Sequence, residues 1–190
     1  MNQDFNIVKS ILSDLKSDYA SRCQLDLIDQ NAPITERDLV AEIYCRLKDF
    51  CTSKNLNVHC EIKPASDETD NTFQLKRLPK IDVGILTNFD DNTWISSAIM
   101  LQEKYQKGLI EARFSSIPIR FFHTAIEVKI QSNYYDAKKD IDILKRLNDS
   151  NQSCNCFFVL LNARGKRLDH DAIQKYADQN GICILEYTCL

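Results

Sequence analysis

Two acidic residues interrupt apolar stretches of this chain, and a lysine follows the second of them by two positions. Asp82 lies within residues 81–86, and Glu127 and Lys129 lie within residues 125–130. Because side chains alternate between the two faces of a strand, Glu127 and Lys129 leave the same face, with their backbones about 7 Å apart. If the two strands are neighbours, two carboxylates and one ammonium converge. Such a set can hold a divalent cation and activate a water bound to it.

Helices are predicted wherever apolar residues recur at steps of three and four. In the second helix Thr35 is the expected N-cap, with Asp38 facing it three residues later. In the last helix either Asp169 or Asp171 can open the helix, and Gly181 can end it because glycine accepts the left-handed backbone found after many helices. The predicted helices span residues 5–19, 35–50, 94–109, 136–148 and a segment that ends before residue 181.

Strands are predicted where apolar residues alternate with polar ones or run without interruption. Alternation from Val58 stops at Pro64, while the continuous run from Cys156 is typical of a strand covered on both faces. Helices join the last three strands, so these strands are expected to be parallel. His123 precedes Glu127 by four residues, which predicts the same strand face and a structural position or one at the rim of the site. The predicted strands span residues 58–62, 81–86, 119–130, 156–161 and 182–185.

Length and composition indicate a single soluble globular domain over residues 1–190, with 44% apolar and 27% charged residues. The order of elements predicts an α/β fold, an α/β/α sandwich with a mixed central β-sheet. Residues 1–30 form an N-terminal helical extension in this interpretation, and residues 89–115 form a helical insertion. We expect both added helices to cover the core; the alternatives are that they grip a substrate or form the seam of a homodimer.

Several classes of protein are disfavoured by what the sequence lacks. No apolar run reaches the ~18–20 residues of a membrane span, and the first residues lack the features of a signal peptide, so we expect a cytoplasmic protein with no membrane partner. Neither a dinucleotide fingerprint nor a P-loop occurs among only four glycines, so no nucleotide cofactor is expected. The eight cysteines are expected to be reduced thiols. A net charge of −3 leaves any nucleic-acid binding to a local basic patch.

In these residues and in the order of its elements, the chain resembles the PD-(D/E)XK nuclease superfamily, whose fold is restriction-endonuclease-like. The resemblance extends from Thr35 to Tyr187. Pro79 supplies the proline of the motif, with two residues between it and Asp82, and Glu127-Val128-Lys129 supplies the remainder.

The resemblance implies a metal-dependent nuclease that hydrolyses phosphodiester bonds in DNA with Mg²⁺ or Mn²⁺. Asp82 and Glu127 would bind the metal, and the backbone carbonyl of Val128 would help to ligate it. Lys129 would be the catalytic lysine that positions or deprotonates the attacking water. Two alternatives share the fold: a non-catalytic module that binds nucleic acid or protein, and an RNA-processing nuclease. Whether cleavage is endo- or exonucleolytic is left open.

A glutamate from the first core helix often completes the site in this superfamily. Residues 35–40 resemble the opening of that helix in the Holliday-junction-resolvase branch. At roughly 100° per residue, Glu36 falls at the centre of the apolar stripe, whereas Glu42 lies on its flank. Glu36 is therefore the expected further catalytic residue, with Glu42 in reserve. A charge favoured by the helix dipole is the alternative interpretation of Glu36.

Polar and basic residues beside the predicted site are candidates for contacts with DNA phosphates. One continues the strand face of Lys129, one lies on the helix that follows, and three cluster after the next apolar strand. On an exposed helix face such lysines often serve only solubility. The candidates are Gln131, Lys138, Arg164, Lys166 and Arg167.

Overall fold

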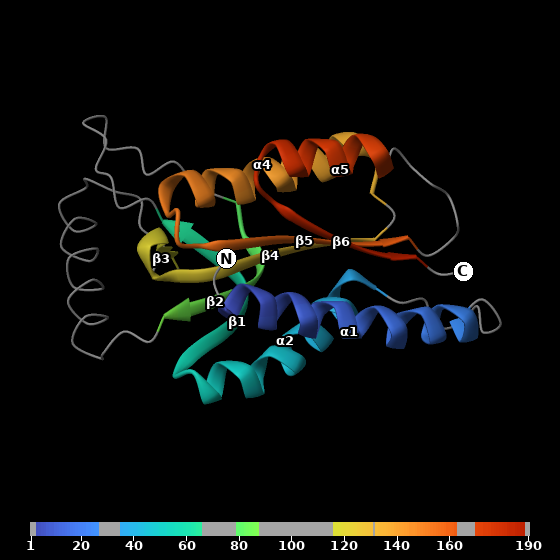
Figure 1. Ribbon diagram of the computed structural model, residues 1–190, viewed down its shortest axis with the longest axis horizontal. Coiled ribbons are helices and arrows are strands. Elements are labelled where there is room, and N and C mark those ends of the chain that lie inside the picture. The colour runs from blue at the N-terminus through green and yellow to red at the C-terminus, as the bar shows by residue number, and fades with distance from the viewer. Residues whose placement is uncertain are drawn as a thin grey trace.

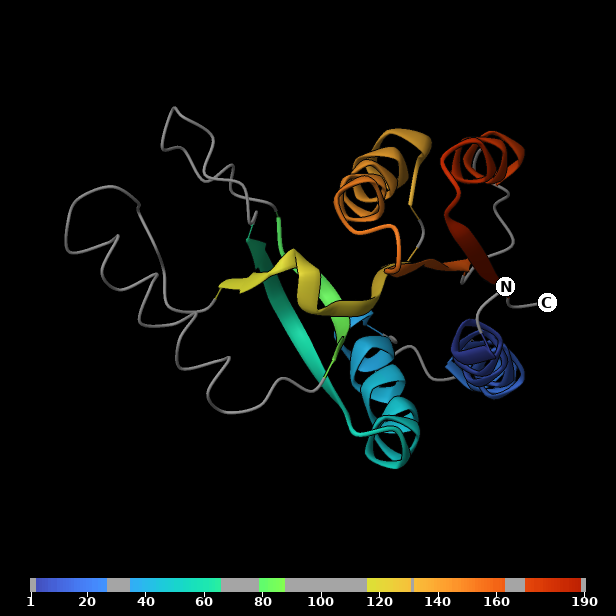
Figure 2. The ribbon, with the colours of Figure 1, turned by 60° about the vertical axis from the view of Figure 1, so that its left-hand side comes forward.

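The computed structural model describes residues 3–26, 35–65, 79–87, 116–130, 132–162 and 170–188. Within them a β-sheet lies between two pairs of helices, as Figure 1 and Figure 2 show from two directions. The helices are α1 (Gln3–Asp26), α2 (Glu36–Ser53), α4 (Tyr134–Ser150) and α5 (His170–Gln179). The strands are β1 (Leu56–Ala65), β2 (Ile81–Thr87), β3 (Ser116–Pro118), β4 (Phe122–Ile130), β5 (Asn155–Asn162) and β6 (Cys183–Thr188).

The sheet is mixed and has the strand order β3-β1-β2-β4-β5-β6. Strand β2 runs antiparallel to both β1 and β4, whereas β4, β5 and β6 are parallel to one another. The α/β class, the mixed sheet and the parallel arrangement of the last three strands are therefore confirmed. Most of the predicted insertion at residues 89–115 lies outside the described residues, as does the whole predicted helix at 94–109.

Two sequence expectations for β4 are wrong, and each error arises from a contact with a distant part of the chain. The predicted strand at 119–130 begins only at Phe122, because residues 119–121 form a 3₁₀ turn. The Asn151 side chain stabilises that turn by donating to the carbonyl oxygens of Ile119, at 3.1 Å, and Phe122, at 2.9 Å. The pairing of β2 with β4 also shifts, because Ile85 pairs with Thr124 whereas Leu86 pairs with Phe122. One residue of β4 is skipped between these two pairs, so the alternation of faces along β4 is broken there.

The shifted register moves His123 away from the face of Glu127. Phe122 joins the core beneath α4 and α5. The His123 imidazole lies towards α1 instead, with Nε2 3.4 Å from the Asp4 carboxylate and Nδ1 2.9 Å from the Thr124 hydroxyl. His123 therefore links the first turn of α1 to the start of β4, at the opposite end of the strand from Lys129.

Helices α1 and α2 cover one face of the sheet. Leu39, Ile43 and Leu47 of α2 and Val8 of α1 are fully buried against Ile126 and other inward-facing residues of β2, β4 and β5. A capping box between Thr35 and Asp38 fixes the start of α2, as predicted. Lys54, which follows α2, pairs with Asp4 at 3.1 Å. The N-terminal helix is thus an integral part of this core.

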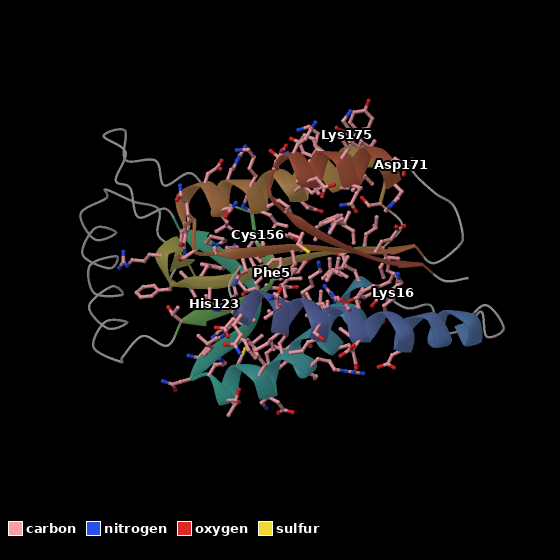
Figure 3. All side chains as sticks on the ribbon, viewed as in Figure 1. Phe5, Lys16, His123, Cys156, Asp171 and Lys175 are labelled. Atoms are coloured by element: carbon pink, nitrogen blue, oxygen red, sulfur yellow. The ribbon has the colours of Figure 1, made fainter. Side chains whose placement is uncertain are left out.

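Helices α4 and α5 cover the other face with a second apolar cluster. Ile141 and Leu144 of α4 and Ile173 of α5 pack there on Phe158 and Leu160 of β5. Figure 3 shows Phe5 and Cys156 on opposite faces of the sheet, the first on α1 and the second beneath α4. The Phe5 ring stacks on Phe157 with centroids 4.9 Å apart. No described helix has the length and apolarity that a membrane span requires.

The buried hydroxyl of Tyr187 connects β6 to α1 by donating a hydrogen bond to the carbonyl oxygen of Leu12. Tyr187→Phe is expected to lower the free energy of unfolding by about 1 kcal/mol, because the ring still fills its place and only the hydroxyl contacts are lost. Urea denaturation measures this loss. An unchanged unfolding midpoint would mean that α1 packs on the sheet without help from this hydrogen bond.

Candidate active site

The pairing of β2 with β4 brings Asp82 and Glu127 together. Val83 is paired with Ile126 in this antiparallel ladder, so the next step of the register places Asp82 opposite Glu127. The Asp82 carboxylate accepts a hydrogen bond of 2.8 Å from the backbone N–H of Val128. This contact fixes Asp82 to β4. The convergence of the two carboxylates expected from the sequence is therefore present.

Glu127 is a buried acid, with only 3% of its surface exposed. Its side chain leaves β4 on the side of α4, because its neighbours Ile126 and Val128 belong to the core on the other side. Within the described residues its Oε1 atom has no hydrogen-bond partner. Burial raises the pKa of Glu127 well above its usual value, and the nearby carboxylates of Asp82 and Asp140 raise it further. Without a cation this carboxyl group therefore holds a proton more tightly than an ordinary glutamate.

Near the end of β4, the Lys129 ammonium lies between carboxylates from the two helical layers. Its Nζ atom is 3.3 Å from Oε1 of Glu36, the first residue of α2, and 3.5 Å from Oδ2 of Asp140 in α4. Burial lowers the pKa of Lys129, but the neighbouring carboxylates, chiefly Asp140 and Glu36, raise it by more. The net pKa lies above the usual value, so this side chain is an ammonium at neutral pH.

The structure brings Glu36 to the site and leaves Glu42 elsewhere on α2. Glu42 pairs with Arg46 one turn later, at 3.2 Å. The capping box of Thr35 and Asp38 holds the first turn of α2 in place, and Glu36 therefore faces the end of β4. The position of Glu36 follows from the helical geometry that distinguished it from Glu42.

Asp140 is a site residue that the sequence analysis missed. Burial raises its pKa from 3.8 to about 6, against the opposing effect of Lys129. A signal was present, because Asp140 lies three residues after Ala137 and four before Leu144, within the buried stripe of α4. An acid in such a stripe is as unusual as one in an apolar strand.

Of the candidates for phosphate contacts, only Lys138 is among the described residues. Its Nζ lies 2.8 Å from the Asp142 carboxylate and 4.7 Å from the centre of the Tyr176 ring. Lys138 thus helps to hold α5 against α4, whatever else it contacts. The remaining candidates lie outside the described residues, namely Gln131, Arg164, Lys166 and Arg167.

The donor atoms at this site fit a hard divalent cation. In the described part of the chain, no set of three or more acidic, histidine or cysteine residues is already arranged as a metal site. Mg²⁺ needs less than that, since it is usually held by one or two carboxylates and keeps several waters. Asp82 and Glu127 supply two carboxylates, and the buried Oε1 of Glu127 has no partner among the described residues. A cation there would satisfy this oxygen.

Comparison with known proteins yields no relative for this chain: no family model matches it, and no curated protein or solved structure is significantly similar to it. Its function must therefore be inferred from the residues of this site and from the fold that positions them.

Proposed function

We propose that this protein is a metal-dependent nuclease with a restriction-endonuclease-like fold that hydrolyses phosphodiester bonds in DNA. One observation carries the proposal. Asp82 and Glu127 lie opposite each other on adjacent strands, and Lys129 follows on the same face of β4 with its ammonium held by two carboxylates. This is the grouping of two oxygen ligands and one cation that metal-assisted hydrolysis of a phosphodiester requires.

The fold supports the proposal because charged residues lie at positions where this fold would otherwise bury apolar ones. A mixed sheet with helices on both faces could bury apolar residues at positions 82, 127 and 129 at lower cost. Instead, the central strands β2 and β4 carry these charged residues at the point where α2 and α4 both reach the sheet. Proteins retain such costly groups chiefly at functional sites.

Each residue of the site has a distinct task in this proposal. A divalent cation, when bound, would acidify a coordinated water and stabilise negative charge on the phosphate. Asp82 and Glu127 bind the cation, and Glu127 must release its proton to do so. Lys129, already an ammonium, orients the attacking water and offsets charge on the phosphate, but it has no free electron pair with which to accept a proton. Its positioning role is therefore favoured over that of a general base.

The proposal is tested with the purified full chain, Mn²⁺ or Mg²⁺, and end-labelled substrates. Single-stranded, duplex and branched DNA are compared with RNA of the same sequence. We expect cleavage of at least one DNA substrate, complete loss of cleavage with EDTA, and recovery when the cation is restored. Cleavage of RNA alone would replace DNA as the substrate. If all substrates stay intact and calorimetry detects no Mn²⁺ binding, the nuclease is disproved in favour of a non-catalytic binding module.

A further inference from the structure

The Lys129 ammonium is held from two sides of the sheet, by residues that we call the Lys129 clamp (Glu36, Lys129 and Asp140). Glu36 comes from the layer of α2, and Asp140 comes from the layer of α4. The Glu36 side chain is 40% exposed, whereas that of Asp140 is only 15% exposed. Asp140 is therefore the buried half of the clamp.

Packing alone does not explain an aspartate at this position of α4. Its neighbours in the stripe, Ala137 and Ile141, are apolar and fully buried. Asp140 Oδ2 is itself buried and makes no hydrogen bond within the described residues, although the Lys129 ammonium lies 3.5 Å away. A buried carboxylate with so few partners lowers the stability of the fold. The contact with Lys129 is therefore what accounts for an aspartate at this position.

We propose that Asp140 is a positioning residue, which fixes the Lys129 ammonium beside Asp82 and Glu127. The proposal rests on the proposed nuclease function. A lysine side chain has a flexible four-carbon stem, so one carboxylate partner leaves its ammonium several positions. With Glu36 alone, the ammonium is drawn towards the exposed end of α2. With Asp140 on the other side, it stays over the end of β4, where the reacting phosphate would lie.

The test compares Asp140→Asn with Asp142→Asn as a matched control. Both aspartates lie on α4, but Asp142 binds Lys138 and Tyr176 instead of Lys129. Asp140→Asn is expected to lower kcat by about 10- to 100-fold, with KM and Mn²⁺ affinity within about twofold of the wild type. Its thermal stability at pH 7 should not fall. Asp142→Asn should show the reverse, a lower stability and an unchanged kcat. Asp140→Glu should restore part of the lost kcat.

A second measurement does not depend on catalysis. Acetylation of lysines by an amine-reactive reagent is followed by mass spectrometry, with Lys139, whose side chain is 74% exposed, as the internal reference. We expect Lys129 to react more slowly than Lys139 in the wild type and several times faster in Asp140→Asn. Unchanged kcat, or unchanged labelling of Lys129, would overturn the positioning role. If the wild type cleaves nothing but the labelling still changes, the clamp is supported and only the proposed function fails.

Discussion

Replacing Lys129 by methionine is expected to lower the rate of metal-dependent DNA cleavage by about 100- to 1,000-fold, the usual effect of losing one group that stabilises developing charge. Methionine keeps much of the length of the side chain but carries no charge. Its introduction also leaves the carboxylates of Glu36 and Asp140 without their shared cation. Initial cleavage rates at saturating Mn²⁺, measured on the best substrate, test this expectation.

Lys139→Met is the matched control for this variant. Lys139 lies on α4, its side chain is 74% exposed, and it pairs with the exposed Asp136 at 3.1 Å. Its loss should change the cleavage rate by less than about threefold, since exposed ion pairs contribute little. Circular dichroism verifies that both variants are folded. Equal rates for Lys129→Met and the wild type would remove Lys129 from the mechanism.

Replacing Glu127 by glutamine is expected to abolish metal-dependent cleavage and, at the same time, to stabilise the metal-free protein. Burial makes the ionised form of Glu127 costly, as its raised pKa records. Glutamine is uncharged at all pH values, so the gain at pH 7 should be about 1–3 kcal/mol, the range for a buried polar group without its partners. Urea denaturation in EDTA measures the gain, and calorimetry measures the loss of Mn²⁺ binding.

The size of this effect depends on pH in a defined way. The folded-state pKa of Glu127 lies above the usual value of 4.5. Below pH 4.5 the acid is protonated in both the folded and the unfolded state, so the wild type carries no penalty and matches Glu127→Gln. As the pH rises through 4.5 the unfolded state ionises first, and the wild type loses stability relative to the variant. The difference stops growing once the pH exceeds the folded-state pKa.

Glu61→Gln controls for the loss of a negative charge. Glu61 lies in β1, its side chain is 55% exposed and it pairs with Lys80 at 2.7 Å. Its replacement should change stability little, because exposed ion pairs contribute little, and it should leave Mn²⁺ binding intact. If Glu127→Gln is less stable than the wild type in EDTA at pH 7, the glutamate is a structural partner of its surroundings and not a ligand held ready for a cation.

The sequence was most informative where one local rule decided the outcome. The capping box at Thr35 fixes the start of α2, and helical geometry then distinguishes Glu36 from Glu42. Apolar periodicity likewise located α4, and an uninterrupted apolar run located the buried strand β5. These features depend on residues within one or two turns of each other, so they could be predicted without knowledge of the partners across the fold.

Features that depend on distant contacts could not be predicted in this way. The 3₁₀ turn before β4 is held by Asn151, which lies 32 residues after Ile119, and the displacement of His123 follows from a register shift between two strands. The burial of Glu127 arises because α4 covers a strand face that alternation alone leaves unassigned. Asp140 could have been recognised as an acid within an apolar stripe, but only the fold shows that Lys129 is its partner.

The two halves of the Lys129 clamp also bear on when the protein could become active. Glu36 and Lys129 are 93 residues apart in the sequence, and Asp140 lies further still towards the C-terminus. During synthesis the chain emerges from its N-terminus, so α2 is available long before β4 and α4 can pack on opposite faces of the sheet. A nascent or partly folded chain would therefore lack a working site. The DNA-cleaving activity that we propose would therefore arise only in the fully assembled domain.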